Sequence, residues 1–186
     1  CGGPGAPAFL HVAERHHQTA RSPLWGWLGH RDPFAFESDY SPAEGPRRFL
    51  CGTPPILSMA ALDAALDLWR GDVDLERVRA KSVALGDALI RCVRERCPAL
   101  ELVSPPGGAR RGSQVTFRHP RGYALVQALI ARGVIGDFRA PDLMRFGLHP
   151  LTLRYVDAWD AVSALAEVLE SGEYLEPRFE RRQTVT

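Results

Sequence analysis

The chain has 186 residues, of which 45% are hydrophobic and 24% charged, and its formal net charge is +1. This composition is typical of a globular protein, and the charge gives no electrostatic reason to expect nucleic acid or an acidic membrane surface as a partner. No apolar run approaches the roughly 20 residues that a membrane-spanning helix needs. The length allows one domain or two small ones.

The four cysteines and six histidines form no recognisable metal-binding motif. No two cysteines have the spacing Cys-x-x-Cys, and Cys92 and Cys97 are five residues apart in a helical pattern, where they point in different directions. We therefore predict reduced thiols, as in a cytoplasmic protein, and no metal site.

The first 50 residues predict mainly loops. Residues 1–7 contain three glycines and two prolines and predict a turn-rich loop, and the apolar residues 8–12 predict a short buried strand. Residues 21–50 predict a long loop that contains six aromatic side chains. That aromatic density argues against disorder and indicates packing, for which a partner subunit is a candidate.

Residues 47–57, Arg-Arg-Phe-Leu-Cys-Gly-Thr-Pro-Pro-Ile-Leu, predict the junction between this loop and a long helix. Gly52 permits unusual backbone geometry, and Pro54-Pro55 suits the first turn of a helix. Thr53 stands where an N-cap would stand. Free N–H groups and the helix dipole make such a junction a natural anion site, although an ordinary capped helix is the simpler alternative.

Two long helices are predicted next, over residues 54–70 and 75–96, ended by Gly71 and Pro98. Each carries an apolar stripe at helical spacing. The stripes consist of Ile56, Met59, Leu62, Leu66 and Trp69 in the first helix, and of Leu75, Val78, Ser82, Leu85, Leu89 and Cys92 or Val93 in the second. At about 33 Å, the second helix has a length that suits a connector between two domains.

Short strands then alternate with helices. Strands are predicted over residues 100–103, 113–118, 134–138 and 143–148, and helices over 122–132 and 157–171. We expect Val115 and Phe117 to point inward from the second of these strands, and Trp159, Val162, Ala166 and Leu169 from the last helix. The pattern predicts a small α+β domain in which helices cover one side of a short sheet.

Arg145 lies in the middle of the last predicted strand. Met144, Phe146 and Leu148 share one face of that strand, so Arg145 points the opposite way. A charged side chain there needs a partner or solvent, and a guanidinium can bind a carboxylate through two parallel hydrogen bonds. The alternative is an edge-strand arginine with a structural Asp or Glu partner, and the pattern alone favours that alternative.

Three motifs occur in order: Gly-Gly-Pro-Gly-Ala-Pro at 2–7, Gly-Trp-Leu-Gly-His at 26–30, and Arg-Phe-x-x-Gly-Thr-Pro-Pro-Ile-Leu at 48–57. Together they resemble kynureninase, a pyridoxal-phosphate (PLP) enzyme of the aspartate aminotransferase superfamily. The resemblance covers essentially the whole chain, at the spacings of that family's C-terminal portion.

The resemblance implies an α/β fold of the PLP-dependent transferase type (fold type I). Residues 1–72 would be the C-terminal part of the large PLP-binding domain, residues 73–98 the connecting helix, and residues 99–186 the small C-terminal α+β domain. Lys81 is the single lysine of the chain and lies mid-helix. Because the family's Schiff-base lysine stands just upstream of the Gly-Gly-Pro-Gly motif, we expect it before Cys1 and assign no catalytic residue to this chain.

The implied reaction is hydrolysis of L-kynurenine to anthranilate and L-alanine, a step of tryptophan degradation by the kynurenine pathway and of NAD biosynthesis. The implied enzyme is a cytoplasmic homodimer with an active site shared between subunits, without nucleic-acid or membrane partners. By resemblance, Trp27 and Thr53 contact the PLP phosphate, Arg145 binds the substrate α-carboxylate, and Phe36 helps to line the substrate pocket. The excess of arginine over lysine also favours a GC-rich bacterial source.

Two alternatives remain open at this point. The chain could belong to another fold type I PLP enzyme, such as a cysteine desulfurase or a class V aminotransferase, although those are not expected to carry the Gly-Trp-x-Gly-His and Gly-Thr-Pro-Pro motifs. It could also be a non-catalytic dimerisation fragment.

Overall fold

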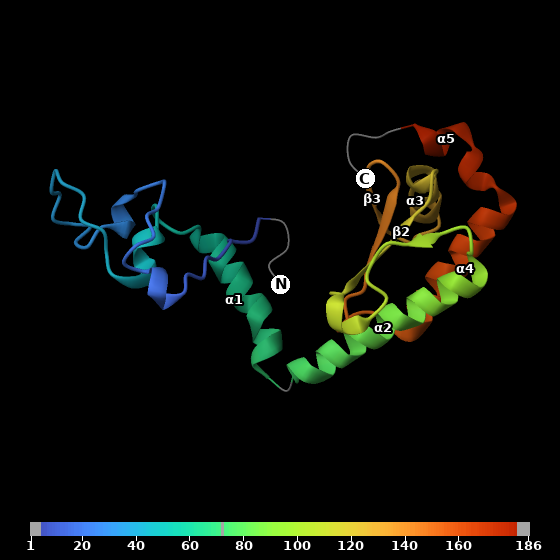
Figure 1. The fold of residues 1–186 in the computed structure, drawn as a ribbon, viewed down its shortest axis with the longest axis horizontal. Coiled ribbons are helices and arrows are strands. Elements are labelled where there is room, and N and C mark those ends of the chain that lie inside the picture. Colours follow the sequence, from blue (N-terminus) through green and yellow to red (C-terminus); the bar gives the residue numbers. More distant parts are fainter. Residues whose placement is uncertain (1–4, 72, 182–186) are drawn as a thin grey trace. The chain divides into compact units, whose positions relative to one another are not determined.

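The computed structural model describes residues 5–71 and 73–181, and the chain divides into two units, Cys1–Val73 and Asp74–Thr186 (Figure 1). Within the described residues, no helix has the length and apolar character that crossing a membrane requires. The assignment of residues 1–72 to a large PLP-binding domain, of 73–98 to a connecting helix and of 99–186 to a small domain stays a prediction.

The first unit consists mainly of loops. It contains three short 3-10 helices, η1 (Glu14–His16), η2 (Trp27–Gly29) and η3 (Gly45–Phe49), and one long helix, α1 (Ile56–Arg70). The strand predicted for residues 8–12 is wrong, and Phe9 in that segment is 95% exposed. A strand needs a neighbouring strand for its backbone groups, and residues 8–12 make no backbone–backbone hydrogen bond within the described part of the chain.

The helix predicted from residue 54 begins later than expected. Pro55 is the N-cap of α1, with no side-chain hydrogen bond, so the prediction of Thr53 as N-cap is wrong. The physical reason is the proline pair, because a residue before proline is disfavoured in the helical region and Pro54 precedes Pro55. The apolar stripe of α1 is not covered within this unit, since none of the α1 residues is buried.

The second unit is built around a four-stranded sheet in the order β1-β2-β4-β3. Its strands are β1 (Glu101–Leu102), β2 (Gln114–Arg118), β3 (Asp137–Arg139) and β4 (Leu143–Gly147). All neighbouring pairs are antiparallel. β2 and β3 therefore run parallel on either side of β4, and helix α3 (Gly122–Ala131) lies between them in the chain.

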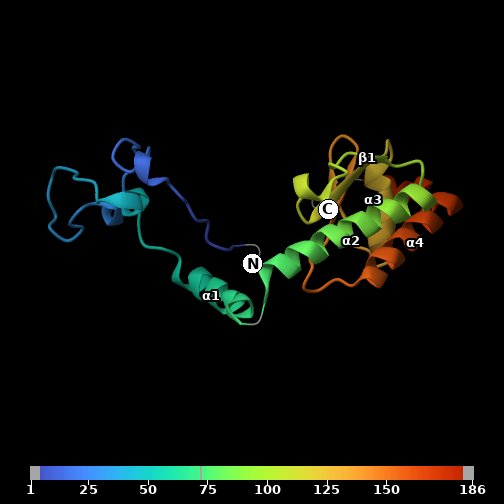
Figure 2. The same cartoon turned by 60° about the horizontal axis from the view of Figure 1, so that its bottom comes forward.

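The described part of this unit also contains the α-helices α2 (Leu75–Arg96), α4 (Tyr155–Ser171) and the short α5 (Pro177–Glu180), and the 3-10 helices η4 (Gly108–Arg110) and η5 (Glu173–Leu175). α2 has the predicted bounds, and its N-cap is Asp74, whose carboxylate accepts hydrogen bonds from the N–H groups of Glu76 and Arg77. α2 and α4 lie side by side in both views (Figures 1 and 2). α4 ends at Gly172, which has the left-handed conformation typical of a helix C-terminus.

One face of the sheet packs against the helices and forms the core. Val115 and Phe117 of β2 and Met144 and Phe146 of β4 are all buried, as the alternation predicted. They pack with Leu85, Leu89 and Val93 of α2, with Leu125 and Leu129 of α3, and with Val162 and Leu165 of α4. The prediction of a sheet covered by helices on one side is therefore confirmed.

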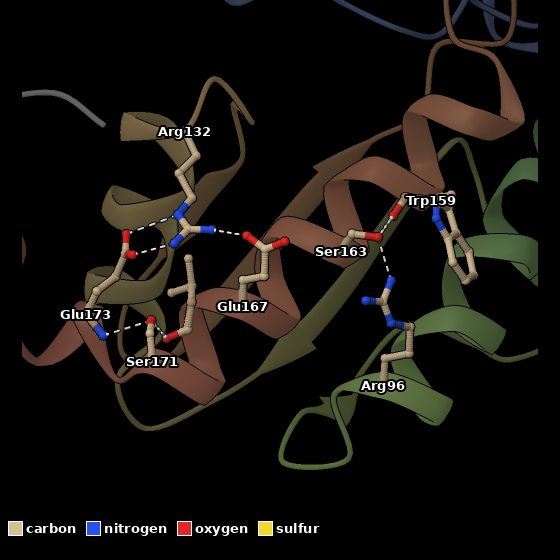
Figure 3. Close-up of polar contacts among 8 residues, drawn as sticks. Arg96, Arg132, Trp159, Ser163, Glu167, Ser171 and Glu173 are labelled. Atoms are coloured by element: carbon tan, nitrogen blue, oxygen red, sulfur yellow. Dashed lines mark hydrogen bonds and ion pairs between the residues drawn. The ribbon is translucent and has the colours of Figure 1, made fainter.

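Two residues of the apolar stripes predicted for α2 and α4 are exposed. Leu75 is 65% exposed in the first turn of α2, and Trp159 of α4 is 50% exposed. The guanidinium of Arg96 lies 4.9 Å from the ring centre of Trp159 and donates a hydrogen bond to Ser163 (Figure 3). Trp159 therefore packs against an arginine at the rim of the core.

Ion pairs join the end of α3 to the end of α4. The guanidinium of Arg132 pairs with Glu167 at 2.6 Å and with Glu173 at 2.5 Å (Figure 3). Because its hydrogen bonds to Glu173 and Glu167 favour the charged form, the pKa of Arg132 is raised.

The stripe of α2 gives a matched test of this core. Leu85 is fully buried, whereas Leu75 on the same helix is 65% exposed. We expect Leu85→Ala to lower the free energy of unfolding by about 2–5 kcal/mol, because it removes buried methyl groups and leaves a cavity. Leu75→Ala should change it by less than about 0.5 kcal/mol. Urea unfolding followed by circular dichroism measures both, and equal losses would contradict this assignment of the core.

Candidate functional site

The Gly-Trp-Leu-Gly-His segment lies directly against the segment that precedes α1. A β-carbon placed on Gly26 would lie 1.4 Å from the carbonyl oxygen of Cys51, and one on Gly29 would lie 2.7 Å from that of Leu50. Both positions therefore require glycine for close packing of two backbones. This contact brings together two motifs that are more than 20 residues apart in the sequence.

Trp27 is placed by this contact beside Gly52. Gly52 has no β-carbon, and one built at this position would lie 3.8 Å from the indole nitrogen of Trp27. Phe34 supports the indole through an edge-to-face contact at 5.6 Å. Thr53 follows Gly52 directly and is exposed. The structure thus brings an indole N–H donor close to the backbone of the Gly52-Thr53 dipeptide.

Phe36 lies on a loop that also contributes to a cavity beside Trp27. The cavity has a volume of 460 Å³ and is lined by Trp27, His30, Asp32, Pro33, Phe34, Phe36, Glu37, Ser38 and Tyr40. Phe36 is 89% exposed and has a positive φ of 52°, which residues with a side chain seldom adopt. Trp27 and Phe36 therefore line one cavity, whereas Thr53 lines a different one together with Phe9, Ile56 and Met59.

His30 closes the base of the Phe36 loop, a role that the sequence did not reveal. Its ring is 8% exposed, with Nδ1 3.0 Å from the backbone nitrogen of Asp32 and Nε2 3.3 Å from the carbonyl oxygen of Asp39. Nδ1 also lies 2.7 Å from the carbonyl oxygen of Asp32, so the ring contacts the backbone of both Asp32 and Asp39. One imidazole thus connects both ends of the loop.

Arg145 lies in the second unit, on the face of β4 that is turned away from the core. Thr116 of β2 and Asp137 of β3 are its neighbours in register. Its Nη2 pairs with the carboxylate of Asp137. Arg145 thus has the structural Asp partner that the pattern favoured, although β4 is a central strand and not an edge strand.

Two other carboxylates of this unit, Glu101 and Asp142, pair with Arg118, at 2.9 Å and 3.3 Å. The hydrogen bond to Glu101, together with the charge of Glu101, raises the pKa of Arg118. Asp137 is therefore the carboxylate that contacts Arg145 among the described residues.

The geometry suits two kinds of anion contact, one in each unit. Next to Gly52, the indole N–H of Trp27 is open to an acceptor such as a phosphate oxygen. On the open face of the sheet, the guanidinium of Arg145 has a donor beyond the one that Asp137 uses, which suits a carboxylate. The described residues contain no group of three His, Cys, Asp or Glu side chains that could hold a metal ion.

Residues 78–165 match the family model described as the kynureninase C-terminal domain. The kynureninase of Burkholderia mallei (strain SAVP1) is 48% identical to the chain over 187 residues, which cover 100% of this chain and 45% of that protein. The kynureninase of Deinococcus radiodurans is 53% identical over 175 residues, which cover 92% and 42%. The chain therefore spans less than half the length of these curated relatives.

Solved structures with a similar fold include a lyase and a desulfurase. The cystine C–S lyase C-DES, in complex with cysteine persulfide, has a TM-score of 0.69 and 22% identity, covering 84% of this chain and 41% of that chain. The apo cysteine desulfurase of Thermococcus onnurineus NA1 has a TM-score of 0.64 and 19% identity, covering 87% and 41%. Another C-DES structure, with a TM-score of 0.68, carries glycine covalently linked to its PLP cofactor.

At such identities the likeness to solved structures concerns the fold alone, and it confirms the predicted fold type I class. The likeness to kynureninases extends to the sequence. Residues 78–165 are thus similar to the kynureninase C-terminal domain, and the whole chain is similar in sequence to the C-terminal part of curated kynureninases.

Proposed function

We propose that this chain is the C-terminal part of an enzyme that hydrolyses L-kynurenine to anthranilate and L-alanine, with PLP as its cofactor. The observation that carries the proposal is the 48% to 53% identity to curated kynureninases over 92% to 100% of the chain. A cysteine desulfurase is not favoured, because two solved enzymes of that type are only 18% and 19% identical to the chain.

The first unit would contribute to the binding of the PLP phosphate. The indole N–H of Trp27 lies beside Gly52 and would donate a hydrogen bond to a phosphate oxygen. The hydroxyl of the exposed Thr53 is a second donor on the adjacent residue. Together they would hold the phosphate and so fix the position of the cofactor ring.

The second unit would hold the amino-acid end of the substrate. Arg145 is 26% exposed at its side chain and can direct a guanidinium donor to a carboxylate. Phe36, on the first unit, would supply part of the aromatic wall around the substrate. Bound PLP supplies the electron sink for the bond cleavage, whereas the residues named here bind and orient the reactants.

A homodimer with a shared active site forms part of the proposal. The support is exposed apolar surface, because Trp25 and Phe34 in the long loop and Ile56 and Met59 on α1 are 45% to 69% exposed. Surface of this kind is typical of a region that a partner subunit covers. The cytoplasmic location stays a prediction.

The test uses the full-length protein that contains this chain, loaded with PLP. We expect addition of L-kynurenine to produce anthranilate, measured by its fluorescence, together with an equal amount of L-alanine. Release of sulfur from cysteine with no anthranilate from kynurenine would overturn the proposal in favour of the desulfurase alternative. Activity of the isolated 186-residue chain would contradict the expectation that the Schiff-base lysine lies before Cys1.

A further inference from the structure

Asp137 contacts Arg145 from the adjacent strand. The two residues face each other in the β3–β4 ladder, and Nη2 of Arg145 pairs with Oδ2 of Asp137. Nη2 of Arg139 lies 3.4 Å from the same oxygen. Asp137 thus lies between two guanidinium groups, and its carboxylate is the charged group in contact with Arg145 among the residues that the structure describes.

The Arg145–Asp137 pair is incompletely bonded. Nε of Arg145 and Oδ1 of Asp137 are both buried and have no hydrogen-bond partner among the described residues. One is a donor and the other an acceptor, on side chains that are already paired. A small rotation of the Asp137 carboxylate would join them, and Asp137 would then hold one edge of the guanidinium through two parallel hydrogen bonds.

Such an arrangement leaves the other terminal nitrogen free. Nη1 of Arg145 has no hydrogen bond or ion pair within residues 5–71 and 73–181. The opposite neighbour, Thr116, is uncharged and 8% exposed, so it does not compete for the guanidinium as an ion. The free end of the guanidinium can therefore meet a second carboxylate while the first holds the side chain in place.

We propose that Asp137 is a positioning residue, which orients Arg145 so that its free donors bind the α-carboxylate of the amino-acid substrate. This inference rests on the function proposed above. Without Asp137, the long arginine side chain would sample many rotamers, and ordering it would weaken substrate binding. Asp137 itself would not touch the substrate.

The experiment compares Asp137→Asn with Asp142→Asn in the full-length, PLP-loaded enzyme. Asp142 is a matched control, because it is a carboxylate in the turn between β3 and β4 that pairs with Arg118 instead. We expect Asp137→Asn to raise KM for L-kynurenine by about 10- to 100-fold, as for a lost charge-assisted hydrogen bond, with a much smaller change in kcat. Asp142→Asn should leave both close to the wild-type values.

A substrate analogue without the α-carboxylate separates positioning from a general structural role. The inhibition constant of this analogue should be the same for the wild type and Asp137→Asn, since Arg145 has nothing to bind in it. Equal weakening of L-kynurenine and of the analogue would overturn the inference. So would an unchanged KM for L-kynurenine in Asp137→Asn.

A second measurement does not depend on the reaction. The NMR signal of the Arg145 Nε–H group should report an ordered side chain in the wild type and a mobile one in Asp137→Asn. An equally ordered signal in both proteins would overturn the inference even if kynurenine is a substrate. A wild-type protein that produces no anthranilate refutes the proposed function, and the NMR comparison then decides the role of Asp137 alone.

Discussion

Replacing Arg145 by alanine should lower kcat/KM for L-kynurenine by about two orders of magnitude, which corresponds to about 3 kcal/mol. The variant removes the guanidinium that we propose for the substrate carboxylate, and it leaves Asp137 without its ion-pair partner on β4. Retention of PLP, measured by absorbance, should not change, because the proposed phosphate contacts lie in the other unit of the chain.

Two further variants make the Arg145 experiment specific. Arg145→Lys keeps the positive charge but loses the planar fork of donors, so we expect it to recover little of the lost binding. Arg118→Ala removes an arginine from the same face of the sheet, one that pairs with Glu101 and Asp142, and should leave kcat/KM close to wild type. A similar loss of kcat/KM in Arg118→Ala and Arg145→Ala would indicate that the total positive charge of this face determines substrate binding. It would contradict a specific contact between Arg145 and the substrate carboxylate.

The local pattern predicted the second unit well, for a physical reason. α2 has its predicted bounds, and the inward residues of β2 and β4 are buried as expected. These elements bury one face against their own unit, so the helical or alternating spacing of their apolar residues predicts which side chains are buried. Leu75 and Trp159 are exceptions. Leu75 lies in the first turn of α2 and is exposed, and the large ring of Trp159 packs against Arg96 and remains half-exposed.

The contact between Asp137 and Arg145 could not be predicted from the sequence pattern. The strand predicted over 134–138 lies over Asp137–Arg139 in the structure, so its register against β4 could not be read from the sequence. A shift of one residue moves every side chain to the opposite face of a sheet. The eight-residue spacing between Asp137 and Arg145 became informative only once the hairpin pairing was known.

The first unit was predicted less well because its apolar residues do not form a core of their own. The apolar residues 8–12 and the α1 stripe find no core within this unit, and Phe9 and Ile56 are 95% and 65% exposed. The sequence motif singled out Trp27, but did not reveal that Gly26 lies against Cys51 and so places the indole. Contacts between distant backbone segments leave no periodic signal in the sequence.

The contact between Gly26 and Cys51 predicts a large effect of the variant Gly26→Ala on PLP binding. A β-carbon there would lie 1.4 Å from the carbonyl oxygen of Cys51, so the two backbone segments must move apart by more than an ångström. The shift would separate the indole of Trp27 from Gly52. A displacement of about 1 Å can reduce the contribution of a positioned group about 100-fold. We therefore expect the dissociation constant of PLP to rise at least about tenfold. Titration of the full-length apoenzyme with PLP measures the change.

The matched control for Gly26→Ala is Gly112→Ala, because a β-carbon on Gly112 would meet no atom within 4 Å. That variant should bind PLP like the wild type. Trp27→Phe provides an independent measurement if Gly26→Ala fails to fold, since it keeps an aromatic ring and removes the N–H donor. Wild-type PLP affinity in both Gly26→Ala and Trp27→Phe would show that this segment does not hold the phosphate. If Trp27→Phe instead binds PLP more weakly and its melting temperature is unchanged, the effect comes from the hydrogen bond of the indole N–H. That N–H is the group that the close backbone contact positions.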